Sequence, residues 1–172
     1  MFKSALTIST GLLLSFNAQA LDLAGTIFGE VEKESGISSE LLYAVALTES
    51  ANGAGKSKVS PSAFAYRTPE GSKYFKTRLE AEAALRIDIS KGIKLIDVGM
   101  MQINLHYHKQ DDPYSLFDPK TNLRVAAKIL ATALTSTDDI TLGIGRYHSW
   151  KNKRAINYGR RVLSIYKNLK NI

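Results

Sequence analysis

The chain has 172 residues, of which 44% are hydrophobic and 23% are charged, and its formal net charge is +7. This length suits one domain with a hydrophobic core, and the balanced composition excludes a disordered or low-complexity protein. The sequence contains no cysteine, so we expect neither disulfide bonds nor a lipid attached to a cysteine.

Residues 1–20 have the features of a cleaved signal peptide. Lys3 provides a basic start, residues 5–16 are mostly apolar, and Ala18-Gln19-Ala20 has the small-x-small form of a signal-peptidase site. The apolar run is shorter than the ~20 residues that a membrane-spanning helix needs. We therefore expect cleavage after Ala20, a periplasmic protein, and no membrane span in the mature chain of residues 21–172.

The mature sequence predicts a mainly α fold (α+β) with one small β-hairpin. Capping residues and apolar residues at helical spacing predict helices at 22–34, 38–50, 77–92, 118–134, 138–147 and 153–169. Ser38, the pair Thr77 and Glu80, and Asp118 before a proline mark three of the helix starts. Extended segments at 63–68 and 72–77 flank a Pro-Glu-Gly turn and predict the hairpin.

Glu49 is the first candidate functional residue because it lies on an apolar helix face. At helical spacing it shares that face with Leu42, Val45 and Ala46. Burial disfavours a carboxylate anion and raises the pKa of the group, as the general acid of a glycosidase requires. The apolar face alone leaves open the alternative of a helix-end glutamate that reaches solvent or caps a loop.

Four short segments follow one another in an order that is typical of one enzyme family. They are Thr48-Glu49-Ser50, Asp97-Val98-Gly99-Met100-Met101-Gln102-Ile103-Asn104, Phe117-Asp118-Pro119 with Asn122-Leu123, and Gly145-Arg146-Tyr147-His148-Ser149. Together they resemble the lytic transglycosylases of the soluble-lytic-transglycosylase (SLT) type, over about residues 37–168. The resemblance implies a lysozyme-like fold and cleavage of the bond between N-acetylmuramic acid and N-acetylglucosamine in peptidoglycan, with a 1,6-anhydro product.

The resemblance also implies the residues of the site. Glu49 corresponds to the catalytic acid and base. The implied substrate-binding residues are Ser50, Gly99, Met101, Gln102, Asn104, Tyr147 and Tyr158. Gly99 is expected to let the backbone approach the glycan, and Tyr147 to donate a hydrogen bond to Glu49 or to an acetamido group. Asn122 is expected to serve the local turn or helix start rather than the substrate.

Two positions depart from the family pattern, and one region suggests a partner. Met100 stands where the family usually has leucine, and His148 stands where it has asparagine. The segment between Ser50 and Gly99, with its hairpin, resembles the subset found with conjugation, type IV secretion and pilus systems. The expected partners are therefore peptidoglycan glycan strands and such an assembly, with no nucleic acid.

Three alternatives remain open from the sequence. A muramidase on the same fold would hydrolyse the bond with a second carboxylate, for which Asp97 is the best candidate, although its position suits a turn or a helix start better. A non-catalytic wall-binding assembly factor would hold glycan through the basic residues of 151–172. His106 and His108 supply only two imidazole ligands, so we expect no metal and no cofactor.

Overall fold

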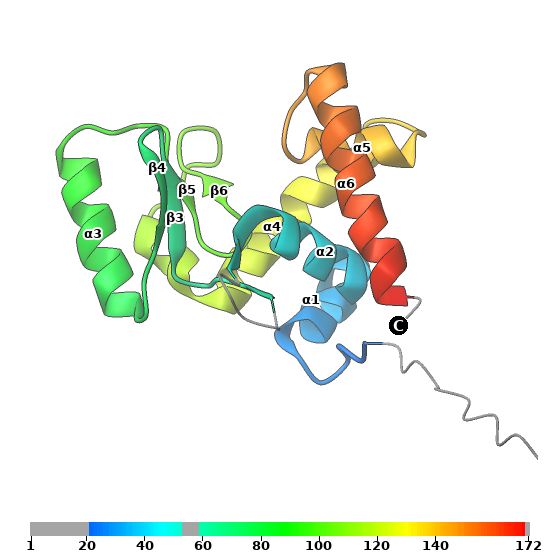
Figure 1. Ribbon diagram of the computed structural model, residues 1–172, viewed down its shortest axis with the longest axis horizontal. Coiled ribbons are helices and arrows are strands. Elements are labelled where there is room, and N and C mark those ends of the chain that lie inside the picture. Colours follow the sequence, from blue (N-terminus) through cyan, green and yellow to red (C-terminus); the bar gives the residue numbers. More distant parts are fainter. Residues whose placement is uncertain (1–20, 53–58, 171–172) are drawn as a thin grey trace, which may run out of the picture.

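The computed structural model describes residues 21–52 and 59–170 and has the expected mainly α architecture (Figure 1). The predicted signal peptide lies outside these residues. The helices are α1 (Ile27–Ser35), α2 (Ser39–Ser50), α3 (Arg78–Ser90), α4 (Pro119–Thr135), α5 (Ile140–Arg146) and α6 (Asn152–Lys170), with a 3₁₀ turn η1 (Pro113–Phe117). Within the described ranges, no helix has the length and apolar character needed to cross a membrane.

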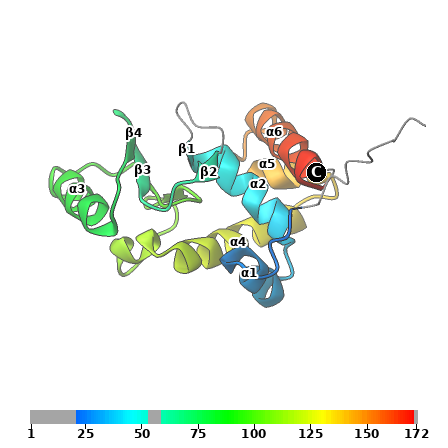
Figure 2. The same cartoon turned by 60° about the horizontal axis from the view of Figure 1, so that its bottom comes forward.

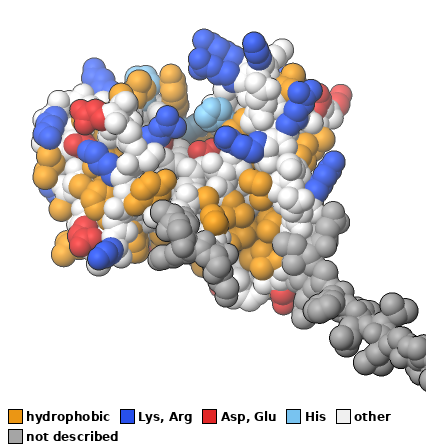
Figure 3. All heavy atoms as spheres, viewed as in Figure 1, with side chains coloured by type: hydrophobic (Ala, Val, Ile, Leu, Met, Phe, Trp, Pro, Cys, Tyr) orange, Lys and Arg blue, Asp and Glu red, His pale blue; other side chains and the backbone are white. Residues whose placement is uncertain are grey.

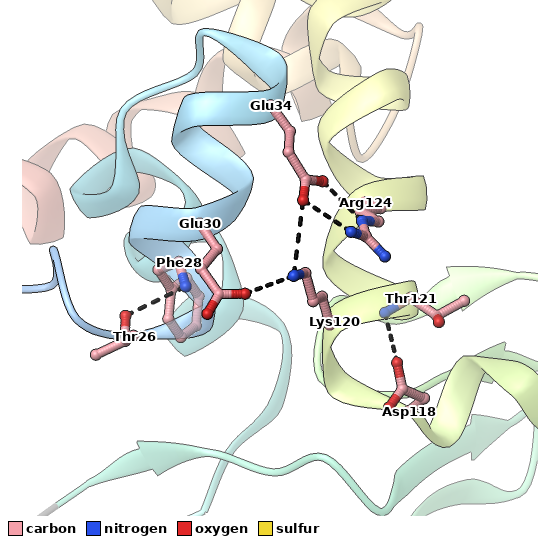
Figure 4. A network of polar contacts seen from close by, with 8 residues as sticks. All are labelled: Thr26, Phe28, Glu30, Glu34, Asp118, Lys120, Thr121 and Arg124. Carbon is pink, nitrogen blue, oxygen red and sulfur yellow. Dashed lines mark hydrogen bonds and ion pairs between the residues drawn. The ribbon is translucent and has the colours of Figure 1, made fainter.

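Local capping explains where the helices begin. The Ser38 side chain accepts from the Leu41 N–H, and Thr77 and Glu80 form the predicted reciprocal capping box. Asp118 caps α4 by accepting from the Thr121 N–H at 2.8 Å (Figure 4). These three predicted helix starts are confirmed. The first helix begins later than predicted, because Thr26 forms a turn with Leu23 and is itself the N-cap.

The predicted hairpin is confirmed as β3 (Ala65–Thr68) and β4 (Gly71–Tyr74). It belongs to an antiparallel sheet of order β4-β3-β5-β6, which adds β5 (Asp97–Val98) and β6 (Ile103–Asn104). The sequence did not predict the added strands, because two residues are too few to show an alternating pattern. A separate two-stranded pair joins β1 (Ala51–Asn52) to β2 (Ser60–Pro61).

The elements form two lobes (Figure 1). The sheet and α3 make one lobe, and α2, α5 and α6 lie in the other. In Figure 2, α4 extends along the lower side of the molecule from η1, which contacts α3, so this helix links the lobes.

Ion pairs orient α1 against α4 (Figure 4). The Glu34 carboxylate accepts two hydrogen bonds from the Arg124 guanidinium, both 2.7 Å long, and Glu30 pairs with Lys120. The four side chains are substantially exposed, so these pairs contribute little to stability and mainly set the position of α1.

Helix α2 lies in the hydrophobic core. Leu42, Val45 and Ala46 are fully buried, which confirms the predicted apolar face, and α2 packs against α6. Met101 and Ile103 of the central motif are also core residues. The apolar face ends at Glu49, so packing of the core determines where that carboxyl group lies.

Candidate active site

Glu49 lies in the last turn of α2 and faces a cleft of about 900 Å³ between the two lobes. The sheet lobe lines this cleft with Arg67, Asp97, Gln102 and Asn104, and the helical lobe lines it with Tyr147 and His148. Figure 3 shows the hollow between the lobes, with acidic and histidine side chains inside it and basic side chains on both sides. Segments that are far apart in the sequence therefore meet around Glu49.

The Glu49 carboxyl group is surrounded by protein although the residue keeps some exposure to the cleft. The pKa of Glu49 is raised to about 7, chiefly by burial and also by the nearby charge of Asp97, while the hydrogen bond from Tyr158 acts in the opposite direction. The raised pKa expected from the apolar face is confirmed. A carboxyl group with this pKa is available in both protonation states near neutral pH, as a group that acts first as an acid and then as a base requires.

Two tyrosines approach this carboxyl group from α6 and from the end of α5. The Tyr158 hydroxyl donates to Glu49 Oε1 at 2.6 Å, whereas the Tyr147 hydroxyl donates to the Met101 carbonyl at 2.7 Å. Burial raises the pKa of both hydroxyls well above 10, so they remain protonated donors. The donor to Glu49 in this structure is thus Tyr158, and of the two partners expected for Tyr147, Glu49 or an acetamido group, Glu49 is not the one that it has here.

Gly99 and Asn122 form a tight contact beneath the cleft. Gly99 has φ +79°, and a Cβ atom there would lie 2.2 Å from Asn122 Nδ2 and 2.5 Å from the Leu116 carbonyl oxygen. The Asn122 amide donates to the Val98 carbonyl at 2.9 Å and accepts from the Met101 N–H at 2.8 Å. Glycine is therefore needed for close packing within the protein. The Asn122 side chain binds the distant segment around Gly99, so the expectation of a local turn or helix-start role is wrong.

Three of the predicted substrate-binding residues lie below the cleft and do not line it. They are Ser50, Gly99 and Met101. The buried Ser50 hydroxyl donates to the Met100 carbonyl at 2.7 Å and accepts from the Ser62 N–H at 3.1 Å. The Met101 side chain is fully buried, and its carbonyl accepts from Tyr147. These contacts join the end of α2 to the motif around Gly99, so they hold Glu49 in position.

Gln102, Asn104 and Asp97 line the sheet side of the cleft. The Gln102 backbone is left-handed at φ 50°, and its side-chain amide donates to the Gly99 carbonyl at 2.8 Å. Asn104 donates to Asp97 Oδ1 at 2.7 Å. Asp97 lies in strand β5, so the expected turn or helix-start role is wrong. Burial raises the pKa of its carboxyl group. The cleft thus holds a second carboxylate besides Glu49.

His148, which stands where the family has asparagine, lies on the Tyr158 ring. The two rings are parallel within 3°, and their centroids are 4.8 Å apart. Burial, with the nearby Arg161, lowers the pKa of His148, so the imidazole is neutral at neutral pH. The histidine therefore covers one face of the tyrosine that donates to Glu49.

Sequence reasoning did not identify several basic residues that line the cleft. Arg67 comes from β3 and Lys128 from α4, and neither belongs to a recognisable motif. Arg154 belongs to the basic run that the sequence did indicate. In the part of the chain that the structure describes, no three histidine, cysteine or acidic residues are grouped so as to hold a metal ion.

The family model of the transglycosylase SLT domain matches residues 26–164, which is well over half of the chain. The chain therefore belongs to the transglycosylase SLT domain family, and this membership supports lytic transglycosylase activity on peptidoglycan. The match also includes α1, which precedes the segment that the motifs alone indicated. No curated protein and no solved structure matches the chain.

Proposed function

We propose that Glu49 alone serves as the acid and the base of a lytic transglycosylase reaction. The observation that carries this proposal is the enclosed Glu49 carboxyl group at the cleft, with a pKa of about 7. A group with a pKa near the working pH transfers protons efficiently in both directions. One carboxylate is then sufficient, in contrast to the two that most glycosidases use.

The protonated Glu49 first gives its proton to the glycosidic oxygen between N-acetylmuramic acid and N-acetylglucosamine. The bond to the muramic acid C1 breaks, and the acetamido oxygen of the same sugar stabilises the positive charge at C1. The ionised Glu49 then takes the proton of the C6 hydroxyl, whose oxygen attacks C1 and closes the 1,6-anhydro ring. The Tyr158 hydroxyl supports this cycle because its hydrogen bond stabilises the anionic form of Glu49.

Three half-buried residues of the cleft are suited to hold the glycan during these steps. Gln102, Asn104 and Tyr147 line the cleft, and the first two carry amides that recognise hydroxyl and acetamido groups. Ser50, Gly99 and Met101 then act indirectly, by holding the end of α2 against the motif.

Mass spectrometry of the fragments released from purified sacculi tests this mechanism. Wild-type protein is expected to release fragments with 1,6-anhydromuramic ends, and Glu49→Gln is expected to lower the rate at least about a hundredfold, because it removes the proton donor. Retained lysis by Glu49→Gln would refute the assignment of the acid. Firm sacculus binding without lysis by the wild type would instead favour the non-catalytic assembly factor.

A hydrolytic muramidase is the second candidate, because Asp97 lies in the same cleft as Glu49. A second carboxylate in that position is able to activate water for attack on the sugar. Reducing muramic ends in the same mass spectra would favour hydrolysis. The hydrogen bond from Asn104 favours a structural and electrostatic role for Asp97 instead, since it occupies an oxygen that would have to accept the proton of water.

We also propose that the protein acts in the periplasm, where it opens the wall locally for a secretion, conjugation or pilus apparatus. The signal-like residues 1–20 and the resemblance of the hairpin region support this location and this partner. Cell fractionation with N-terminal sequencing of the recovered protein tests the predicted cleavage after Ala20. Recovery of uncleaved protein in the cytoplasm would contradict it.

A further inference from the structure

A smaller hollow adjoins the cleft on the exposed side of α6. It has a volume of about 230 Å³ and is lined by His148, Arg154, Asn157, Tyr158 and Arg161. His148 and Arg154 also line the main cleft, so the two spaces share a wall. A molecule bound at Glu49 therefore has this hollow directly beside it.

Helical spacing brings two guanidinium groups to the hollow. Arg154 and Arg161 are seven residues apart and lie on one face of α6, on either side of Tyr158. The Arg161 guanidinium lies 5.5 Å from the centre of the Tyr158 ring, whose hydroxyl bonds to Glu49. The positive charges are thus positioned beside the proposed acid.

These charges lack acidic partners within the described part of the chain. Neither Arg154 nor Arg161 takes part in the ion pairs there, which involve α1, α3, α4 and β4. The hollow is lined by no carboxylate among the described residues. Arg67, Lys128 and Lys151, which line the main cleft, also have no ion pair with a described acidic residue. The hollow beside Glu49 therefore offers positive charge to an anionic ligand.

A guanidinium group binds a carboxylate through two parallel hydrogen bonds. Where the peptide is attached, it occupies the lactyl carboxylate of the muramic acid, so the sugars carry no free carboxylate. The peptide stem itself ends in carboxylates. We propose that the hollow of Arg154, Asn157 and Arg161 is a carboxylate subsite for the peptide stem. The inference rests on the proposed function, since it requires the glycan to lie beside Glu49.

Two double variants with the same change of charge on the same helix test the subsite. Arg154→Gln with Arg161→Gln removes both guanidinium groups of the hollow. Lys153→Gln with Arg160→Gln removes two neighbouring charges that line neither the hollow nor the cleft. The control therefore reports any effect of net charge alone.

Three substrates identify the source of the carboxylate. Native sacculi carry peptide carboxylates. Treatment of sacculi with carbodiimide and ammonia converts these groups to amides. Glycan stripped of its peptides by an amidase carries only lactyl carboxylates. We expect wild-type protein to cleave native sacculi about fivefold faster than amidated ones, a size typical of partly exposed charge pairs. The difference should disappear in the Arg154 and Arg161 double variant and persist in the control.

Equal cleavage of native and amidated sacculi by the wild type would overturn the proposal. Equal losses of activity on native sacculi in the two double variants would overturn it too. Cleavage of stripped glycan at the native rate would assign the hollow to the lactyl carboxylate instead and also contradict it. If the wild type cleaves none of the three, the proposed function fails separately. Sedimentation of Glu49→Gln with native and amidated sacculi then still measures the carboxylate preference, and equal binding would overturn the subsite.

Discussion

The hydroxyl group of Tyr158 lies 2.6 Å from Glu49 Oε1, although the two residues are 109 positions apart. The contact joins the end of α2 to the middle of α6, and the ring of His148 covers the tyrosine. The pKa of Glu49 is thus determined by burial together with groups from other elements. Single substitutions can measure the contribution of each group separately.

Tyr158→Phe is expected to raise the pKa of Glu49 above its present value of about 7. The hydroxyl stabilises the anion, so its loss favours the protonated acid, and the alkaline limb of the pH–rate profile should move up by about one pH unit. Turbidity loss of sacculi at a series of pH values measures this shift. Tyr147→Phe is the control, because its hydroxyl donates to Met101 and not to Glu49. The same displacement in both variants would contradict a specific role of Tyr158.

Asp97→Asn is expected to move the alkaline limb in the opposite direction. The negative charge of Asp97 raises the pKa of Glu49, and its removal lowers that pKa. The hydrogen bond to Asn104 can be retained by the asparagine oxygen, so the fold should persist. With Glu49 as the only acid and base, this variant should still release 1,6-anhydro ends. An enzyme that loses all activity while its stability is unchanged would instead support the muramidase mechanism.

Gly99→Ala is expected to destabilise the protein by about 3 kcal/mol or more. The added methyl group would meet Asn122 and the Leu116 carbonyl, and the left-handed backbone adds strain. Urea unfolding followed by circular dichroism measures the loss. Gly25→Ala is the matched control, because nothing lies within 4 Å of a Cβ atom there and its stability should change little. Similar losses in the two variants would disprove the close packing at Gly99.

Asp88→Ala is expected to cost about 2 kcal/mol, because it leaves the buried Tyr66 hydroxyl without an acceptor. Glu82→Ala on the same helix removes only a surface pair with Arg78 and should cost about 0.5 kcal/mol or less. Thermal unfolding of both variants measures the difference, and equal costs would contradict the importance of burial.

The contribution of Asp88 should also depend on pH. Burial opposes ionisation, but hydrogen bonds from Lys73 and Tyr66 outweigh it and lower the pKa of Asp88 below 3.8. The stabilisation is therefore complete above the pKa of the unfolded chain and is lost as the pH falls through the lower folded value. The difference in stability between the wild type and Asp88→Ala should accordingly become smaller in strong acid, and a constant difference down to that pH would contradict the prediction.

The sequence by itself determined the features that depend on neighbouring residues. Caps such as Ser38 and Asp118 predicted where helices begin, and helical spacing placed Glu49 on the buried face of α2. The order of the four motifs predicted the family that the chain belongs to. These features are encoded within a few positions of one another, so they can be recognised without knowing the fold.

Only the tertiary structure decided which groups surround Glu49. It made the hydroxyl of Tyr158, and not that of Tyr147, the donor to the carboxyl group, placed Asp97 in a strand of the cleft, and packed Asn122 against Gly99. Each of these contacts joins segments that are far apart in the chain, and their geometry follows from how the helices and the sheet pack. The protonation of Glu49 is therefore a property of the assembled core, while its position on the helix is a property of the sequence.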